Sequence, residues 1–218
     1  MIEDERIGLY IHSLDQELSE PLRTVEQEAL ANAVPIIKKS TQTLLRFLVK
    51  LKKPTQILEV GCAVGFSALL MCEAMPEGGH ITTIEKVPQR ISKAKENFSF
   101  AGKEEAITLL EGDAIELLST LVQQGKKYDM IFMDAAKGQY LNFFDDIMKL
   151  LSQDGLLISD NVLQDGDIVE SRYAIKKRNR TIHSRMREYL YTLTHHKDLD
   201  TVILPMGDGV TLSTKLNC

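Results

Sequence analysis

Short apolar runs and longer amphipathic stretches alternate through the middle of the chain. The apolar runs have the length of buried strands and occupy five segments: Gln56–Val60, His80–Glu85, Ile107–Glu111, Tyr128–Met133 and Gly155–Ser159. The stretches between them have the spacing of amphipathic helices, which we place at Phe66–Met75, Pro88–Ala101, Ala114–Gln124 and Tyr140–Leu151. This alternation predicts an α/β fold built on a doubly wound, mostly parallel sheet.

The N-terminal quarter of the chain shows helical periodicity only. Before Pro54, the apolar spacing predicts three helices, at Arg6–Glu17, Pro21–Ala33 and Ser40–Lys52. The core face of the third helix is expected to consist of Leu44, Leu45, Phe47, Leu48 and Leu51. Two interpretations of this region stay open. It could provide packing or dimer contacts, or it could form a lip over an active site near Pro35–Lys39.

The C-terminal quarter changes character again. Asp167–His195 is long and mostly polar, and it predicts a helical region with a break near Arg180. Two short strands are then expected at Thr201–Leu204 and Val210–Thr214. The turn residues Pro205–Gly209 between them predict a hairpin, and hence an antiparallel pair at the end of the sheet.

The length and composition are those of one globular domain. The chain has 218 residues, of which 44% are hydrophobic and 26% are charged. No repeat or linker interrupts it, so we predict a single domain spanning residues 1–218. Within it, residues 1–53 form an N-terminal helical region and residues 54–218 form the core.

Charge and cysteine content narrow the cellular setting. The net charge of −5 argues against a protein coated in positive charge, although it does not exclude a local basic face. No apolar run approaches the roughly 18 residues of a membrane span, and the N-terminus lacks an apolar signal sequence. The three cysteines, Cys62, Cys72 and Cys218, lack metal-ligand spacing. We therefore expect a cytoplasmic protein with reduced thiols and no membrane association.

A glycine-containing loop follows the first predicted strand. The segment Glu59–Gly65 reads Glu-Val-Gly-Cys-Ala-Val-Gly, which permits a tight turn and close approach of a ligand. It is not a dinucleotide fingerprint, because Ala63 stands where the second glycine would be. Glu85, at the end of the second strand, is placed to accept both hydroxyls of a ribose. Asp113, after the third strand, could flank an adenine, cap the next helix, or do both.

Three oxygen-bearing side chains follow two neighbouring strands. Asp134 ends the fourth strand, and Asp160 and Asn161 end the fifth. Adjacent strands lie about 5 Å apart, so these side chains should converge at the carboxyl edge of the sheet. Carboxylate and amide oxygens suit Mg²⁺, Ca²⁺ or Mn²⁺ and do not suit zinc. Lys137, three residues beyond Asp134, is a candidate proton acceptor.

Taken together, these motifs resemble the cation-dependent class I O-methyltransferases, which include the catechol and caffeoyl-CoA O-methyltransferases. The resemblance covers residues 35–218 and rests on five segments: Glu59–Gly65, Glu85, Gly112–Ala114, Asp134–Lys137 and Asp160–Leu163. Within the family, the chain is most similar to bacterial tRNA 5-hydroxyuridine methyltransferases. The resemblance implies a Rossmann-like fold with a seven-stranded, mostly parallel sheet, an antiparallel last strand, and frequent pairing as a homodimer.

The resemblance also implies a cofactor and a set of roles. S-adenosylmethionine would be the methyl donor, and its methionine part would be surrounded by Glu59, Gly61 and Ser67. Glu85 would bind the ribose, while Asp113 and Ala114 would meet the adenine. Asp134, Asp160 and Asn161 would hold Mg²⁺, and Asp134 would also lie near the donor. Asp134 and Lys137 would be the catalytic residues, with Lys137 taking the proton of the acceptor hydroxyl.

The acceptor needs two neighbouring oxygens, a property that catechols and 5-hydroxyuridine share. Gln164 and Asp165 replace the aromatic residue of plant relatives, and the chain has no tryptophan, which disfavours a flat phenylpropanoid pocket. Between Ser171 and Arg187 there is no acid and there are seven cations: Arg172, Lys176, Lys177, Arg178, Arg180, Arg185 and Arg187.

This basic segment favours tRNA as a partner, with phosphate contacts at Lys176, Lys177, Arg178 and Arg180. Lys38 and Lys39 could extend the same face. The alternative is a solvated helix face or the rim of a dimer. The favoured hypothesis is methylation of the 5-hydroxyl of wobble 5-hydroxyuridine in the tRNA anticodon. Methylation of small catechols and a non-catalytic nucleotide-binding scaffold remain as alternatives.

Overall fold

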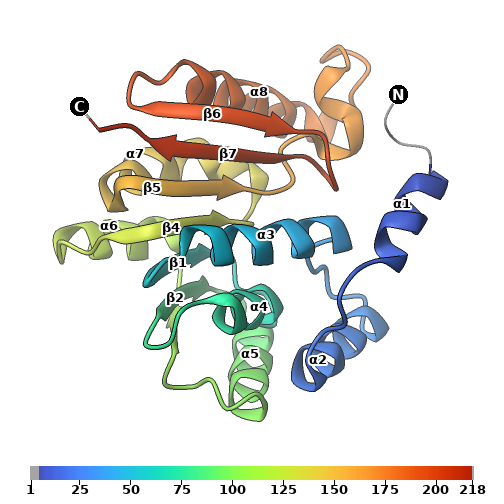
Figure 1. Ribbon diagram of the computed structural model, residues 1–218. Helices are drawn as coiled ribbons and strands as arrows, with labels where there is room; N and C mark the ends of the chain where they lie inside the picture. Colours follow the sequence, from blue (N-terminus) through green and yellow to red (C-terminus); the bar gives the residue numbers. More distant parts are fainter. Residues whose placement is uncertain (1–4, 218) are drawn as a thin grey trace.

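The computed structural model describes residues 5–217 and shows one seven-stranded sheet (Figure 1). The strand order is β3-β2-β1-β4-β5-β7-β6. The strands are β1 (Gln56–Val60), β2 (His80–Glu85), β3 (Ile107–Glu111), β4 (Tyr128–Met133), β5 (Leu151–Ser159), β6 (Leu199–Leu204) and β7 (Val210–Lys215). The first five strands are parallel, and β7 runs antiparallel to both of its neighbours. The predicted Rossmann-like sheet with an antiparallel last strand is therefore confirmed.

The helices around this sheet are α1 (Glu5–Ser13), α2 (Glu20–Ala31), α3 (Lys39–Lys52), α4 (Phe66–Ala74), α5 (Pro88–Phe100), α6 (Ala114–Gln123), α7 (Tyr140–Leu150) and α8 (Arg180–His195). Helices α2 to α8 cover the two faces of the sheet, and α1 lies to one side of it (Figure 1). Residues of α2 to α5 pack in one apolar core, and residues of α6 to α8 pack in the other. The central strands are apolar on both faces because each face is covered.

Strand β4 shows how one run of residues serves two cores. Met130 and Phe132 belong to the core beneath α3 and α4, whereas Ile131 and Met133 belong to the core beneath α6 to α8. All four side chains are fully buried. Successive side chains of a strand point to opposite faces, so the apolar run anchors β4 from both sides. This anchoring fixes the position at which Asp134 leaves the sheet.

The N-terminal helices differ in part from the prediction. Helix α1 ends at Ser13, short of Glu17, and its Tyr10 is 66% exposed. In α3, Phe47 and Leu51 are 61% and 67% exposed, so their assignment to the core face was wrong. The apolar positions of α3 are wider than one face, and only the stripe that includes Leu45 and Leu48 meets the sheet.

The region before α8 is broken, as expected near Arg180. Two 3₁₀ turns, η2 (Gln164–Val169) and η3 (Lys177–Asn179), precede the helix, and α8 begins at Arg180. Strand β5 begins at Leu151, before the predicted Gly155, because Leu151 already pairs with Tyr128 of β4 ahead of a shift in register.

Two further expectations concern the cysteines and the membrane. Cys62 and Cys72 are free thiols, and Cys218 lies outside the described residues. Between residues 5 and 217, no helix has both the length and the apolar composition needed to cross a membrane.

Candidate active site

The loops after β1 and β4 touch at the carboxyl edge of the sheet. Gly61 has a φ of +104°, and a Cβ added to it would lie 2.1 Å from the carbonyl oxygen of Asp134. No side chain fits at that distance, so only glycine lets the two loops meet. The Gly61 and Cys62 amides donate to the Ile84 carbonyl oxygen of β2, at 3.1 and 3.0 Å. The loops after β1 and β4 and the end of β2 are therefore held together as one continuous surface, which forms the floor of the site.

A cavity of about 630 Å³ opens above this floor. It is lined by most of the predicted site residues: Gly61, Ser67, Glu85, Asp113, Ala114, Asp134, Asp160 and Asn161. Its lining also includes the segment Pro35–Lys38, which precedes α3. Its place in the cavity lining is consistent with the lip over an active site that the sequence left open for residues 35–39. Glu59 and Lys137 are not among the lining residues.

Glu59 lies beneath the cavity, fully buried in β1. Ser67 Oγ donates to Glu59 Oε1 at 2.5 Å, and Thr83 Oγ1 donates to Oε2. Burial raises the pKa of Glu59 from 4.5 to about 7, although the two hydroxyl donors act in the opposite direction. Because Ser67 does line the cavity, Glu59 fixes the side chain of a wall residue from below.

Glu85 organises the loop backbone while facing the cavity. Its Oε2 accepts from the Ala63 amide at 2.9 Å, and its Oε1 accepts from the Lys86 and Val87 amides at 2.8 and 3.0 Å. A carboxylate has about four acceptor sites, so three amide bonds leave room for a ligand hydroxyl. The loop after β1 and the start of α5 are thus held in position by one side chain.

Asp113 is the N-cap of α6. Its Oδ1 accepts from the Ile115 amide at 3.0 Å, and its Oδ2 pairs with Lys86 Nζ at 3.3 Å. The Ile115 amide, and then Lys86, lower the pKa of the Asp113 carboxyl. Asp113 and Ala114 also line the cavity, so the capping interpretation holds and a contact with a ligand is sterically open.

Asp134, Asp160 and Asn161 converge at one end of the cavity, which we call the carboxylate end. Met133 of β4 pairs in register with Ser159 of β5, so the residues that follow lie side by side. The side-chain Nδ2 of Asn161 donates to Asp134 Oδ1 at 2.8 Å. The backbone amide of Asn161 donates to Asp160 Oδ1 at 2.9 Å. Asn161 has a φ of +63°, a conformation that asparagine tolerates better than most residues.

Asp160 is buried and Asp134 is partly buried beside it, and this placement is costly for two like charges. Asp160 is 3% exposed, and burial followed by the charge of Asp134 raises its pKa to about 7. Burial likewise raises the pKa of Asp134, while the Asn161 amide and the Lys137 ammonium partly offset it. Two shielded carboxyl groups beside an asparagine side-chain amide are a set of residues that a hard divalent cation fits, with the amide oxygen turned to the ion. Among the side chains that the structure describes, no group of three or more His, Cys, Asp or Glu is arranged to hold a metal ion, so a third ligand here would be the Asn161 side-chain amide.

Lys137 begins the 3₁₀ turn η1 (Lys137–Gln139) between β4 and α7. Its neighbours Ala136 and Gln139 line the cavity. Its positive charge acts on both Asp134 and Asp160. Lys137 is therefore close to the paired carboxyl groups, although it does not line the cavity itself.

The predicted basic segment, residues 171–187, begins after η2 and runs into α8, and its part before α8 lies at the carboxyl edge of the sheet (orange in Figure 1). Lys176, Lys177 and Arg178 are exposed. Arg180 is used internally, since its guanidinium donates to the Ile175 and Tyr173 carbonyl oxygens at 3.1 and 3.3 Å. Of the four predicted phosphate contacts, the structure therefore leaves three facing solvent.

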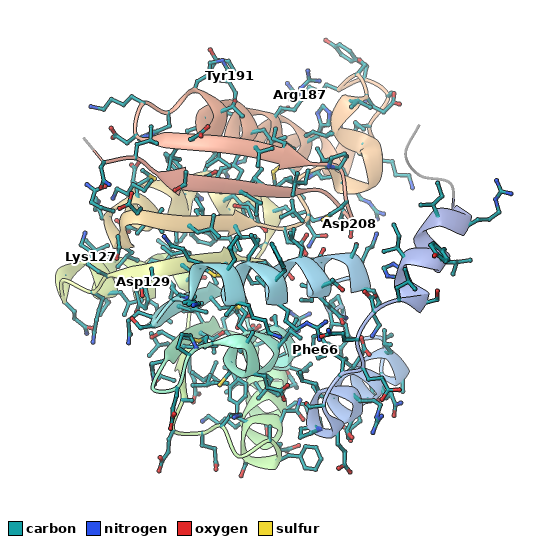
Figure 2. All side chains as sticks on the ribbon, viewed as in Figure 1. Phe66, Lys127, Asp129, Arg187, Tyr191 and Asp208 are labelled. Atoms are coloured by element: carbon teal, nitrogen blue, oxygen red, sulfur yellow. The ribbon has the colours of Figure 1, made fainter. Side chains whose placement is uncertain are left out.

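The hairpin between β6 and β7 adds an unpredicted site residue, Asp208 (Figure 2). Asp208 lines the cavity and forms an ion pair with Lys38 of the lip. Backbone amides of Val162 and Leu163 donate to the Gly209 and Asp208 carbonyl oxygens, at 3.0 and 2.9 Å. The sequence marks this Gly-Asp-Gly segment only as a turn, and nothing local signals its contact with residue 38.

Sheet order, cofactor-sized cavity and carboxylate end together define a Rossmann-like methyltransferase. The family model described as O-methyltransferase matches residues 10–216. The chain is 28% identical over 219 residues to caffeoyl-CoA O-methyltransferase 1 from Eucalyptus globulus, covering 96% of this chain and 89% of that one. It is 34% identical over 127 residues to a catechol O-methyltransferase from Niastella koreensis, covering 58% of each chain.

Solved structures agree with this relationship. A crystal structure from Staphylococcus aureus, assigned to the caffeoyl-CoA O-methyltransferases, is 31% identical with a TM-score of 0.85 and covers 97% of both chains. A methyltransferase from Podospora anserina, solved with bound S-adenosylhomocysteine, is 25% identical with a TM-score of 0.86, covering 98% of this chain and 95% of that one. The chain belongs to the O-methyltransferase family. The predicted S-adenosylmethionine-dependent O-methyltransferase is confirmed at the level of that family.

Proposed function

We propose that this protein transfers a methyl group from S-adenosylmethionine to the 5-hydroxyl of 5-hydroxyuridine at the wobble position of tRNA, with the help of a divalent cation. The observation that carries the proposal is a juxtaposition at one edge of the sheet. The buried Asp134–Asp160 pair closes one end of the cavity, and the exposed cations Lys176, Lys177 and Arg178 lie at the same edge. The first feature suits an acceptor with two oxygens, and the second suits phosphates.

The floor of the cavity would hold the methyl donor. S-adenosylmethionine carries its methyl group on a sulfonium sulfur. An acceptor oxygen attacks this methyl group in line with the S–CH₃ bond, and S-adenosylhomocysteine leaves. Ser67, supported by Glu59, and the backbone at Gly61 would hold the methionine part of the donor. Glu85 would accept from the ribose hydroxyls, and Asp113 and Ala114 would flank the adenine.

The carboxylate end would hold the acceptor. A divalent cation between Asp134, Asp160 and Asn161 would lower the pKa of an acceptor hydroxyl. Lys137 lies close to both carboxyl groups, and its amine would accept the proton of that hydroxyl. Asp134 would serve both ends, because its backbone meets the donor loop and its side chain meets Asn161.

An anticodon base is suited to this open cavity. Bases in a loop are already unpaired, so the protein does not need to open a duplex before the base enters. The exposed basic segment would contact phosphates of the anticodon stem while the base occupies the cavity.

Small catechols are the second candidate acceptors. They share the two neighbouring oxygens, and a relative 34% identical over 127 residues is named a catechol O-methyltransferase. A non-catalytic scaffold is disfavoured, because it has no need for Asp134, Lys137, Asp160 and Asn161 together.

One assay separates the three candidates. Purified protein, Mg²⁺ and methyl-labelled S-adenosylmethionine are offered either bulk tRNA that lacks the modification or a small catechol. The proposal expects label in tRNA that is lost with EDTA. Label that persists with EDTA would refute the role of the cation, and label in the catechol alone would refute the RNA acceptor. Label in neither would favour the scaffold.

We also propose that the protein forms a homodimer through its N-terminal helices. Tyr10, Leu14, Phe47 and Leu51 are large apolar side chains that are each more than half exposed. Light scattering should give twice the monomer mass of 24.5 kDa. A monomer across the micromolar range would contradict this proposal.

A further inference from the structure

The ion pair between Lys38 and Asp208 joins two segments that are far apart in the sequence. Lys38 ends the lip, and Asp208 lies in the turn between β6 and β7. Both residues line the cavity. The turn itself is held against the loop that follows Asn161 by the two backbone hydrogen bonds to the Asp208 and Gly209 carbonyl oxygens. The lip is therefore tied, through Lys38, to the hairpin at the carboxylate end of the cavity, which holds Asp134 and Asp160 and which we also call the acceptor end.

Before a cation binds, carboxyl groups outnumber the lining cations at this end of the cavity, which disfavours an anion. Three carboxyl groups line it, from Asp134, Asp160 and Asp208, and the charge of Asp208 acts on both of the others. The other lining cations, Lys86 and Arg90, belong to the segment that follows β2 at the donor floor. A nucleotide entering the acceptor end brings phosphates on both sides of its ribose. Lys38 is the lining cation at this end.

The two lysines at the start of α3 are placed differently. Lys38 turns to the cavity and to Asp208 of the hairpin, and its side chain is 53% exposed. Lys39 turns away from it and pairs with Glu26 Oε2 of α2 at 2.7 Å, with its side chain 47% exposed. The two lysines are adjacent, similarly exposed and both ion-paired. They differ because only Lys38 reaches the acceptor end of the cavity.

We propose that Lys38 is a specificity-determining residue that binds a phosphate next to the acceptor nucleoside, exchanging Asp208 for the phosphate when RNA enters. Lysine suits this exchange, because its ammonium is a point charge on a flexible stem and does not require a fixed geometry. The inference rests on the proposed RNA acceptor. It makes Lys38 selective for nucleotides over uncharged acceptors with the same two oxygens.

The test uses one enzyme with two acceptors that carry the same reactive base, one without and one with the phosphates of an RNA strand. The acceptors are 5-hydroxyuridine as a free nucleoside and the same base within an anticodon stem-loop RNA. Lys38→Ala should lower kcat/KM for the RNA about three- to tenfold, as expected for one phosphate contact, and leave that for the nucleoside unchanged. The slope of log(kcat/KM) against log salt should become shallower by about 0.7, the value for one phosphate of a single strand.

Lys39→Ala is the matched control and should leave both acceptors unchanged. Lys38→Arg keeps the charge and should restore most of the RNA activity. Affinity for S-adenosylmethionine, measured by calorimetry, should be the same in all variants, which establishes that each one is folded.

Three outcomes overturn the inference in distinguishable ways. Equal RNA kinetics in Lys38→Ala and Lys39→Ala would show that Lys38 contacts no phosphate. An equal loss with the nucleoside would show that Lys38 acts through the lip or the carboxylate end. If the unchanged enzyme methylates the nucleoside but not the RNA, the proposed function fails and this inference fails with it.

Discussion

At the scale of single residues, the site depends on close approach and on burial. Gly61 lets the loop after β1 touch the backbone of Asp134, so the donor floor and the carboxylate end share one wall. Glu59 carries a buried carboxyl group whose hydrogen bonds hold Ser67 and Thr83. The resemblance in sequence assigns both Gly61 and Glu59 to the binding of the methyl donor. The structure gives Glu59 a supporting position below the cavity, which the sequence could not distinguish from direct contact.

Replacing Gly61 by alanine should damage the site. The added Cβ meets the Asp134 carbonyl oxygen, so Gly61→Ala should weaken S-adenosylmethionine binding at least about tenfold and lower stability by about 1–3 kcal/mol. Gly78→Ala is the control, because Gly78 also has a positive φ but has open space around it. Calorimetric titration of both variants measures the effect. Equal affinities would mean that the contact between the loops does not matter for binding.

The buried Glu59 carboxyl predicts a pH dependence of stability. Its pKa is raised to about 7 when folded, so the folded protein retains a proton that the unfolded chain releases above pH 4.5. Stability from this group is present below that value and falls as pH rises toward 7, by up to about 3 kcal/mol. Glu59→Gln should remove the loss, so without cofactor the variant should gain stability relative to the natural chain between pH 5 and pH 8. Urea unfolding at both pH values measures this, and a constant difference would contradict it.

At the scale of elements, the carboxyl edge of the sheet collects segments from the whole chain. The parallel strands and their order follow from the alternation of apolar runs and amphipathic stretches, and that part was predictable. The convergence of Asp134 with Asp160 was predictable as well, because neighbouring parallel strands end at the same edge. Helix α3 was only partly predictable, since apolar periodicity does not distinguish a residue facing the core, such as Leu48, from an exposed one, such as Phe47.

The basic segment before α8 should act as a unit. Reversing the charge of Lys176, Lys177 and Arg178 to glutamate should lower kcat/KM for tRNA at least about tenfold and weaken its salt dependence. The same triple change at Lys50, Lys126 and Lys197 is the charge-matched control. These exposed lysines lie at the opposite edge, near the end of α3 and the starts of β4 and β6. Methyl transfer to tRNA and to the nucleoside is compared for both variants, and equal losses would mean that only net charge matters.

At the scale of the whole molecule, charge is distributed unevenly in an acidic protein. The net charge is −5, yet the exposed cations Lys176, Lys177 and Arg178 gather at the carboxyl edge of the sheet. The contact of Lys38 with Asp208, 170 positions apart in the chain, arises only when the hairpin and the lip meet over the sheet. No periodicity or motif could have indicated it. Likewise, the sequence places Lys137 near Asp134 in the chain, but it does not show that Lys137 stays out of the cavity lining to which Ala136 and Gln139 belong, which depends on the path of η1.

The most direct measurement locates the transferred methyl group. Unmodified tRNA that contains 5-hydroxyuridine is incubated with S-adenosylmethionine and Mg²⁺, digested to nucleosides and analysed by mass spectrometry. We predict 5-methoxyuridine with the natural chain, none with EDTA, and at least about a 100-fold slower reaction with Asp160→Ala, since a cation stabilises developing charge by several kcal/mol. Asp160→Ala should still bind S-adenosylmethionine. A methyl group at any other position, or undiminished product with EDTA and with Asp160→Ala, would contradict the account.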